Sequence, residues 1–251
     1  MDNFAVRSFG GGALTMVAAP SWTEVDGLLR EPRLTALGLK HGFTTRKSGN
    51  MKDVSRRREA AAQLGLPEPL TLKQVHGITI HDGTASNAGL EGDGWILSKP
   101  GVTVGVYVAD CVPLYLWSHD GKAAGVFHAG WRGTAKHMAK SAVAAFNDRL
   151  GIPASKLSAA MGPHIGPCCY KVGPELEKDF PESSFVRRDG AVYLDLAAET
   201  RRQLTESGVS AENIGAPAMC TASNPNELFS YRRDKQDARL LALLSLDLWP
   251  S

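Results

Sequence analysis

The stretch that decides the fold is residues 123–150, AAGVFHAGWRGTAKHMAKSAVAAFNDRL. Ala123–His128 is a short apolar run that predicts a buried strand, and the glycines at 130 and 133 mark a tight turn after it. From Thr134 to Leu150 apolar residues recur every three or four positions, which predicts a helix that Gly151 and Pro153 end. A buried strand that turns directly into a helix is typical of α/β proteins.

The same alternation of strands and helices continues on both sides of this stretch. Valines at alternate positions from 102 to 108 predict a strand that is buried on both faces and ends at Ala109-Asp110-Cys111. Similar patterns predict helices at 55–64, 174–180 and 196–207 and strands at 157–161 and near Val192. The sequence therefore predicts one α/β domain over residues 34–251, preceded by a loosely attached arm over residues 1–33.

Composition excludes several classes of function. The 28 basic and 26 acidic residues give a net charge of +2, which lacks the concentrated positive charge that binds nucleic acid. The most apolar stretch, residues 102–117, is too short for a membrane span and contains Asp110. The first 20 residues do not resemble a signal peptide, so we expect a cytoplasmic location. The four cysteines include an adjacent pair and are interpreted as thiols or ligands.

Three segments place a metal-binding residue at the end of an apolar run. These residues are His76, Cys111 and His128. Two histidines and one cysteine are a known ligand set for catalytic zinc, with the fourth position left open. Two alternatives remain at this point: Cys111 and His128 form a nucleophile and base pair, or all three are ordinary buried residues.

Two further segments contain candidate anion-binding arginines. Backbone amides at the turn 130–133, with Arg132 beside them, would bind a phosphate or carboxylate, although a turn that only permits close packing has the same pattern. In Phe229-Ser-Tyr-Arg-Arg-Asp234, one arginine of the pair Arg232 and Arg233 could face a phosphate or base ring while the other pairs with Asp234. A solvated run of charges is the alternative. The loop with His164, Cys168 and Cys169 is either a metal site or a turn.

Over residues 34–246 the sequence resembles the bacterial purine nucleoside phosphorylase family that was long labelled multicopper polyphenol oxidase or laccase domain. Some of its members are called peptidoglycan editing factor. Five ordered motifs carry the resemblance: Gln-Val-His-Gly at 74–77, Ala-Asp-Cys-Val-Pro at 109–113, His-Ala-Gly-Trp-Arg-Gly at 128–133, Gly-Pro-His-Ile-Gly-Pro-Cys-Cys-Tyr at 162–170 and Phe-Ser-Tyr-Arg-Arg-Asp at 229–234.

The resemblance implies an αββα arrangement of mixed sheets with flanking helices, related to toxin-type cysteine hydrolases. It implies a zinc site from His76, Cys111 and His128, phosphorolysis of adenosine, inosine, guanosine or methylthioadenosine, and deamination of adenosine. We expect Arg46 and Arg132 to bind phosphate, and Asp110 and Cys111 to act in catalysis. Candidate substrate contacts are Asp93, Gly130, Arg232 and Arg233.

The sequence departs from the family pattern at two places. The loop after Arg46 is shorter, and Asp237-Ala-Arg239 replaces a Thr-Gly-Arg segment. The chain has seven histidines and no His-x-His pair, so we expect no multicopper cluster, although copper could replace zinc in a single site. We therefore expect a monomeric zinc enzyme acting on purine nucleoside and phosphate. The alternatives are a metal-free Cys-His hydrolase or cell-wall precursor editing factor, a copper-dependent polyphenol oxidase, and a non-catalytic binding protein.

Overall fold

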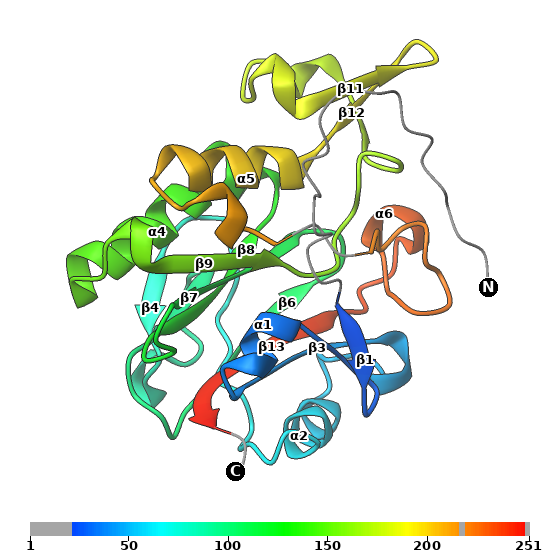
Figure 1. Cartoon of the computed structure of the whole chain (residues 1–251). Helices are drawn as coiled ribbons and strands as arrows, with labels where there is room; N and C mark the ends of the chain where they lie inside the picture. Colours follow the sequence, from blue (N-terminus) through cyan, green and yellow to red (C-terminus); the bar gives the residue numbers. More distant parts are fainter. Residues whose placement is uncertain (1–21, 216–218, 249–251) are drawn as a thin grey trace, which may run out of the picture.

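The computed structural model describes residues 22–215 and 219–248, which fold around two five-stranded sheets and a smaller three-stranded one (Figure 1). The first sheet has the order β1 (Thr23–Val25), β2 (Leu28–Arg30), β3 (Leu39–Thr44), β13 (Leu240–Leu248), β6 (Thr103–Val108). The second has the order β4 (Ile80–Asp82), β5 (Gly94–Leu97), β8 (Ala124–Ala129), β7 (Val112–Ser118), β9 (Leu157–Met161). The small sheet contains β10 (Lys171–Val172), β12 (Ala191–Leu194) and β11 (Phe185–Arg188).

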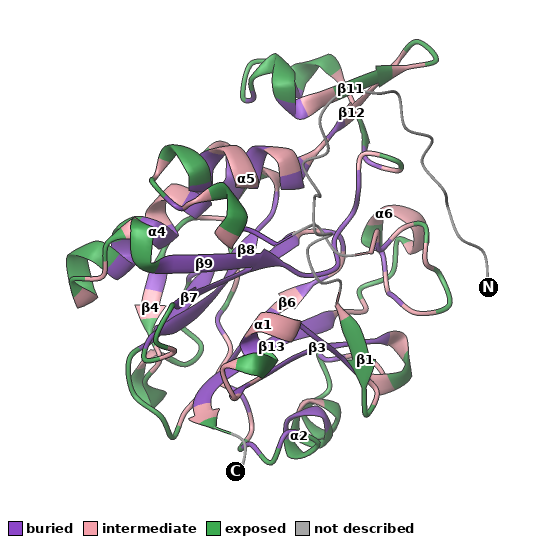
Figure 2. Ribbon diagram, in the orientation of Figure 1, coloured by how far each residue is buried: buried purple, intermediate pink, exposed green. Residues whose placement is uncertain are grey.

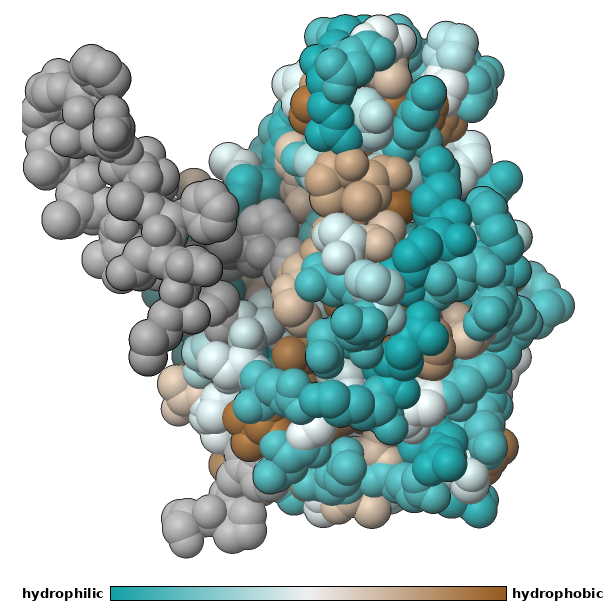
Figure 3. All heavy atoms as spheres, turned by 90° about the vertical axis from the view of Figure 1, so that its right-hand side faces the viewer, coloured by the Kyte–Doolittle hydropathy of each residue, from teal (hydrophilic) through white to brown (hydrophobic). Residues whose placement is uncertain are grey.

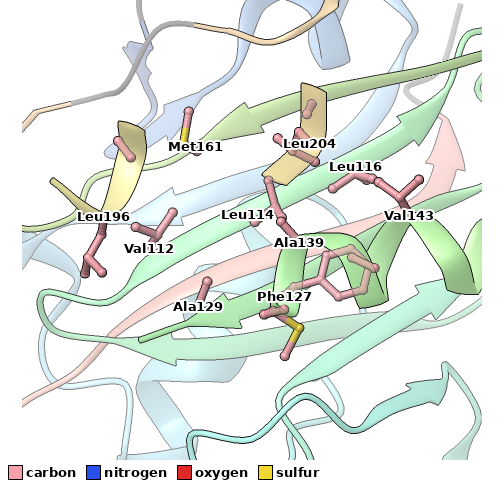
Figure 4. Packing of buried hydrophobic residues seen from close by; sticks show 14 of the residues in the cluster. Val112, Leu114, Leu116, Phe127, Ala129, Ala139, Val143, Met161, Leu196 and Leu204 are labelled. Carbon is pink, nitrogen blue, oxygen red and sulfur yellow. The ribbon is translucent and has the colours of Figure 1, made fainter. Parts of the chain in front are cut away.

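The two large sheets pack face to face between helices. The core between them joins side chains of β6 and β13 to side chains of β5, β7 and β8, including Val106, Trp95 and Tyr115. The outer face of the second sheet is covered by α4 (Met138–Leu150) and α5 (Leu196–Glu206), as Figure 4 shows for residues of β7, β8 and both helices. The outer face of the first sheet packs on α2 (Val54–Ala62). This order of layers confirms the predicted αββα arrangement, and Figure 2 shows the buried strands at its centre.

Most of the predicted elements lie within a few residues of the observed ones, with one correction among the long helices, but β1, β2, β4 and β5 were not predicted. The predicted helix 134–150 is two helices, α3 (Trp131–Ala135) and α4, because His137 adopts the left-handed backbone conformation with φ 65°. After the break, α4 packs on the second sheet through Ala139 and Val143. The predicted helix 174–180 is only a short 3-10 turn, Pro174–Leu176.

The first sheet extends further toward the N-terminus than the predicted domain boundary. Leu28–Arg30 is buried and pairs with β3, so residues 23–30 belong to the sheet rather than to a loose arm. The helix α1 (Pro32–Ala36) follows directly. Residues 1–21 of the predicted arm lie outside the described residues. Near the other end of the chain, β13 lies between β3 and β6 and joins distant parts of the sequence in one sheet.

The face in Figure 3 is largely hydrophilic with small, separated hydrophobic patches. Across the described residues, none of the helices has the length and apolar character needed to cross a bilayer.

Candidate active site

The structure brings together the three metal-ligand candidates. Cys111 lies in the turn where the chain passes from β6 in one sheet to β7 in the other, and His128 lies on β8. His76 lies in the loop before β4 with φ 58°, a conformation that non-glycine residues rarely adopt. The ligand atoms of the three side chains all lie within 4.8 Å of one another. Elements far apart in the sequence therefore build one His-Cys-His group.

The buried carboxylate of Asp93 holds two parts of this group in place. Its Oδ1 accepts hydrogen bonds from His128 Nδ1 at 2.8 Å and from the backbone N–H of His76 at 2.9 Å. Its Oδ2 accepts the backbone N–H of Gly77 at 2.7 Å and that of Val75 at 3.2 Å. These bonds fix the strained loop at His76, and they leave Nε2 of His128 free for the ligand group. A carboxylate that accepts a hydrogen bond from the other ring nitrogen commonly orients a metal-bound histidine.

Gly130 borders the centre of the group. A Cβ at this position would lie 2.8 Å from Cys111 Sγ and 3.0 Å from Cδ2 of His76. The absence of a side chain therefore leaves open the space that the His-Cys-His group faces. Gly133 permits an equally close approach, because a Cβ there would lie 2.9 Å from the carbonyl oxygen of Gly77.

The electrostatics of the group favour a thiolate beside a histidine cation. Burial disfavours the thiolate of Cys111, but His128 and His76 outweigh it and lower the pKa of Cys111 to about 6. Burial disfavours the cation of His128, but Cys111 and Asp93 outweigh it and raise the pKa of His128 to about 9. Burial also disfavours the carboxylate of Asp93, yet hydrogen bonds from His128 and from the backbone N–H of Gly77 lower its pKa. Near neutral pH the group without metal therefore carries opposite charges.

The His-Cys-His group lines a cavity of about 1110 Å³. The volume is slightly above the range of about 300–1,000 Å³ that is usual for small-molecule sites. Aromatic rings and cationic side chains from several elements form much of the wall: Lys52, Lys73, Tyr107, Trp131, Arg132, Tyr170, Tyr231, Arg232, Lys235 and Arg239. The cavity therefore offers both flat apolar surfaces and positive charge to a ligand.

Asp110 also lines this cavity, and the structure shows what holds it there. Its φ is 97°, so the turn between β6 and β7 adopts a strained conformation immediately before Cys111. Oδ1 accepts the hydroxyl of Thr221 at 2.6 Å, and Oδ2 accepts the backbone N–H of Arg232 at 2.6 Å. The carboxylate therefore connects the turn that carries Cys111 to the helix α6 (Tyr231–Asp234).

The four candidate arginines separate into two groups. Arg132 and Arg232 line the cavity, each with its guanidinium over a ring, Trp131 at 4.4 Å and Tyr170 at 4.8 Å. Arg232 Nη1 also donates to the carbonyl oxygen of Lys171 at 2.5 Å.

Arg46 and Arg233 both pair with Asp234, at 2.9 Å and 2.6 Å, and neither lines the cavity. The structure therefore corrects the pairing of Arg46 with Arg132, because Arg46 is engaged with Asp234 and with the ring of Phe229. Arg233 is a structural arginine whose Nη1 donates to the carbonyl oxygens of Thr221 and Ala222. Of the two adjacent arginines, only Arg232 is placed to contact a ligand.

Asp93 requires a similar correction. It is fully buried, its oxygens accept the four hydrogen bonds described above, and it does not line the cavity. Its place beside His128 makes it a positioning residue rather than a substrate contact.

Sequence reasoning missed most of the aromatic wall of the cavity. Tyr170 and Trp131 stood inside recognised motifs but had no assigned role, and Tyr107 stood within the buried valine strand. Gln74 was equally unmarked, yet its side chain makes two hydrogen bonds to the backbone of Tyr107, at 2.6 Å and 2.8 Å. The available signal was a tyrosine between two valines of the strand 102–108. In the structure Tyr107 is the half-buried residue of this otherwise buried strand.

A cavity lined by a His-Cys-His group on an αββα scaffold defines a class of candidate metal-dependent enzymes. Within this class the particular family follows from the sequence. The family model described as Multi-copper polyphenol oxidoreductase laccase matches residues 40–247, and the chain belongs to this family. The resemblance seen in the motifs is thereby confirmed.

Three relatives illustrate the similarity. A protein named purine nucleoside phosphorylase from Xylella fastidiosa is 36% identical over 205 residues, which cover 76% of this chain and 77% of that protein. A protein named adenosine deaminase RL5, from an unknown prokaryotic organism, is 36% identical over 155 residues, which cover 58% of this chain and 59% of that protein. The crystal structure of YlmD from Geobacillus stearothermophilus is similar with a TM-score of 0.81 and 30% identity, covering 90% of this chain and 98% of that one.

Proposed function

We propose that this chain is a zinc-dependent purine nucleoside enzyme whose principal reaction is phosphorolysis. The observation that carries the proposal is the convergence of His76, Cys111 and His128 within 4.8 Å at a cavity with aromatic and cationic walls. The names of the relatives supply the substrate class, purine nucleosides, and support phosphate as the second substrate.

The ligand group fits zinc. In a tetrahedral site with metal-ligand distances of about 2.0–2.3 Å, two ligand atoms lie about 3.5 Å apart, which the 4.8 Å limit accommodates. The missing side chain at Gly130 leaves room for an ion, and Asp93 presents His128 through one defined nitrogen. When bound, zinc supplies Lewis acidity at an open coordination position, because the protein provides three ligands.

The cavity wall supports a division of roles for phosphorolysis. The rings of Tyr170 and Trp131 offer surfaces for a purine, and the guanidinium groups of Arg132 and Arg232 offer charge-assisted hydrogen bonds to phosphate. A phosphate oxygen then attacks ribose C1′, and the bond from C1′ to the purine breaks. The leaving purine takes up a proton.

Asp110 is the candidate for handling that proton. The other carboxylate of the described wall, Asp237, is paired with Lys52 and Arg239, whereas Asp110 is held at the wall by hydrogen bonds from Thr221 and Arg232. Deamination of adenosine in the same cavity is a second reaction, supported by the name of the relative RL5.

A different candidate function rests on the charges of the metal-free site. Because the pKa of Cys111 is lowered to about 6 and that of His128 is raised to about 9, Cys111 is a thiolate near neutral pH. A thiolate beside a histidine cation is a nucleophile for an amide or ester. This cysteine hydrolase is the alternative that the test must separate from the zinc enzyme.

The test measures metal content and turnover on the same untagged preparation. Adenosine is supplied with and without phosphate, and the products are separated as adenine with ribose 1-phosphate, or inosine with ammonia. We expect phosphate-dependent release of adenine that disappears after chelation and returns with zinc. Hydrolysis of a test ester that survives chelation and is abolished by Cys111→Ser, with no nucleoside turnover, would favour the cysteine hydrolase instead.

A further inference from the structure

A second group of candidate metal ligands, made of three cysteines, lies outside the wall of the candidate active site. The Sγ atoms of Cys168, Cys169 and Cys220 all lie within 4.8 Å of one another, and those of Cys168 and Cys169 are 3.5 Å apart. No pair of them is bonded, because a disulfide requires about 2.05 Å. Two loops that are distant in sequence therefore bring three free thiols to one place.

The backbone holds these loops together independently of the thiols. His164 and Cys220 form a parallel bridge, in which the N–H of Thr221 donates to the carbonyl oxygen of His164 at 2.9 Å. The N–H of Gly166 donates to Sγ of Cys220 at 3.2 Å, so this sulfur already acts as an acceptor. A Cβ at Gly166 would be in ordinary van der Waals contact with both cysteines, 3.4 Å from Sγ of Cys168 and 3.8 Å from Sγ of Cys220. The arrangement is a built feature of both loops.

The donor set determines which ion it suits. The group consists of three sulfurs, whereas the group at Cys111 combines one sulfur with two imidazoles. Thiolate ligands select soft ions such as Cu(I), and zinc in structural sites takes four protein ligands. Three sulfurs around one ion at about 2.3 Å would lie about 4 Å apart, which agrees with the 4.8 Å limit. We propose that Cys168, Cys169 and Cys220 form a three-thiolate binding site for Cu(I).

Two guanidinium groups are hydrogen-bonded to the loops that carry the three thiols. The guanidinium of Arg233 donates to the carbonyl oxygens of Thr221 and Ala222, directly after Cys220. That of Arg188 donates to the carbonyl oxygen of Cys168 at 2.6 Å. Each loop therefore has a cation bound to it. The exposed side chain of Cys168 gives an ion access from solvent, while Cys169 and Cys220 are partly buried.

The proposed site is connected to the cavity through the residues that follow its cysteines. Tyr170 follows Cys169 and lines the cavity, and Thr221 follows Cys220 and donates its hydroxyl to Asp110 at 2.6 Å. An ion bound by the three sulfurs would thus fix both loops beside the candidate active site. Binding itself requires no assumption about the reaction in that cavity.

The experiment titrates Cu(I) into the fully reduced, zinc-loaded protein without oxygen, in competition with a chromophoric Cu(I) chelator. We expect one tight equivalent with sulfur-only coordination by X-ray absorption. Loss of a residue that only hydrogen-bonds to a metal ligand costs about 10–100-fold in metal affinity. Loss of a direct ligand in Cys220→Ser should therefore lower the Cu(I) affinity at least about tenfold. Cys168→Ser, which changes an exposed side chain, should cause a similar loss. Cys111→Ser, the same change at the other site, should keep the equivalent.

Circular dichroism and thermal unfolding check that each variant is folded. If Cys220→Ser does not fold, Cys168→Ser still tests the proposal. Retention of full Cu(I) affinity in Cys168→Ser would overturn the proposal. So would nitrogen in the coordination shell, or loss of the equivalent in Cys111→Ser. Zinc that competes for the three sulfurs as strongly as Cu(I) would overturn the choice of ion.

Discussion

The close approach at Gly130 allows a sharp test of the metal site. Gly130→Ala adds one methyl group that would lie 2.8 Å from Cys111 Sγ, whereas ordinary contact begins at 3.4 Å, so the sulfur must retreat by about 0.6 Å. Metal-ligand distances tolerate only about 0.2 Å, so the displacement is about three times what a bound ion accepts. We expect zinc affinity to fall at least about 10–100-fold, or about 1.4–2.7 kcal/mol.

Folding should change much less than zinc binding in this variant. Gly130 has φ −75° and ψ 170°, an extended conformation that alanine adopts without strain. The matched control is Gly77→Ala beside the same site, because a Cβ there would have its nearest contact at 3.4 Å, from Asp93 Oδ2. Zinc affinity is measured by competition with a chromophoric chelator, and stability by thermal unfolding of the metal-free proteins. The reasoning is refuted if Gly130→Ala and Gly77→Ala bind zinc as tightly as the unchanged protein.

Three other predictions concern buried or charged groups. Asp93→Asn replaces an acceptor of four hydrogen bonds and should weaken zinc binding about 10–100-fold in the same competition assay; unchanged affinity would contradict its positioning role. Arg132→Ala should raise the KM for phosphate about 10–150-fold, because a charged hydrogen bond contributes about 1.5–3 kcal/mol. Arg46→Ala, which changes a residue outside the cavity wall, should leave this KM unchanged. Equal effects of the two changes would show that the phosphate subsite is misplaced. Burial opposes the carboxylate of Glu199, but hydrogen bonds from Arg202, Gln203 and Ser184 outweigh it and lower the pKa of this group below the ordinary 4.5. The ionised carboxylate therefore stabilises the folded state fully above pH 4.5, and this stabilisation is lost as the pH falls through the lowered pKa. Urea unfolding between pH 7 and pH 3 should therefore show a steeper acid loss in the unchanged protein than in Glu199→Gln, and parallel curves would exclude this contribution.

Local pattern was sufficient for several of the elements and for selecting the three ligand candidates. The buried valine strand is β6, with bounds that differ by one residue, and the helix expected at 55–64 is α2, whose first turn is capped by Asp53 accepting the N–H of Ser55. The ligand candidates were recognised by their placement after apolar runs; in the structure Cys111 and His128 lie at or near strand ends, whereas His76 lies in a loop.

The contacts of the site were not accessible to the same reasoning. Pattern did not show that Arg46 faces Asp234, because that pairing joins residues from opposite ends of the chain. Nor did it predict the left-handed backbone of His76, Asp110 and His137, since glycine is the residue that usually marks such positions. In the case of His76 the cause is tertiary: the buried carboxylate of Asp93 accepts three successive backbone N–H groups of that loop. A carboxylate that shapes a loop from a distance leaves no local signal.

The positions of the candidate metal ligands also bear on the copper in the family description, because they show whether a multinuclear copper cluster could form. Four-electron reduction of dioxygen needs a multinuclear copper cluster, and the sequence has no His-x-His pair to build one. Among the described residues, the groups of three or more candidate ligands are the His-Cys-His group and the three cysteines, each of a size for one ion. Copper bound by the three sulfurs would be held as Cu(I), the state that thiolates favour. Phenol oxidation by copper-loaded protein should therefore depend on the single His-Cys-His site, so that His128→Ala abolishes it while Cys168→Ser does not. Oxidation that survives His128→Ala would contradict this account.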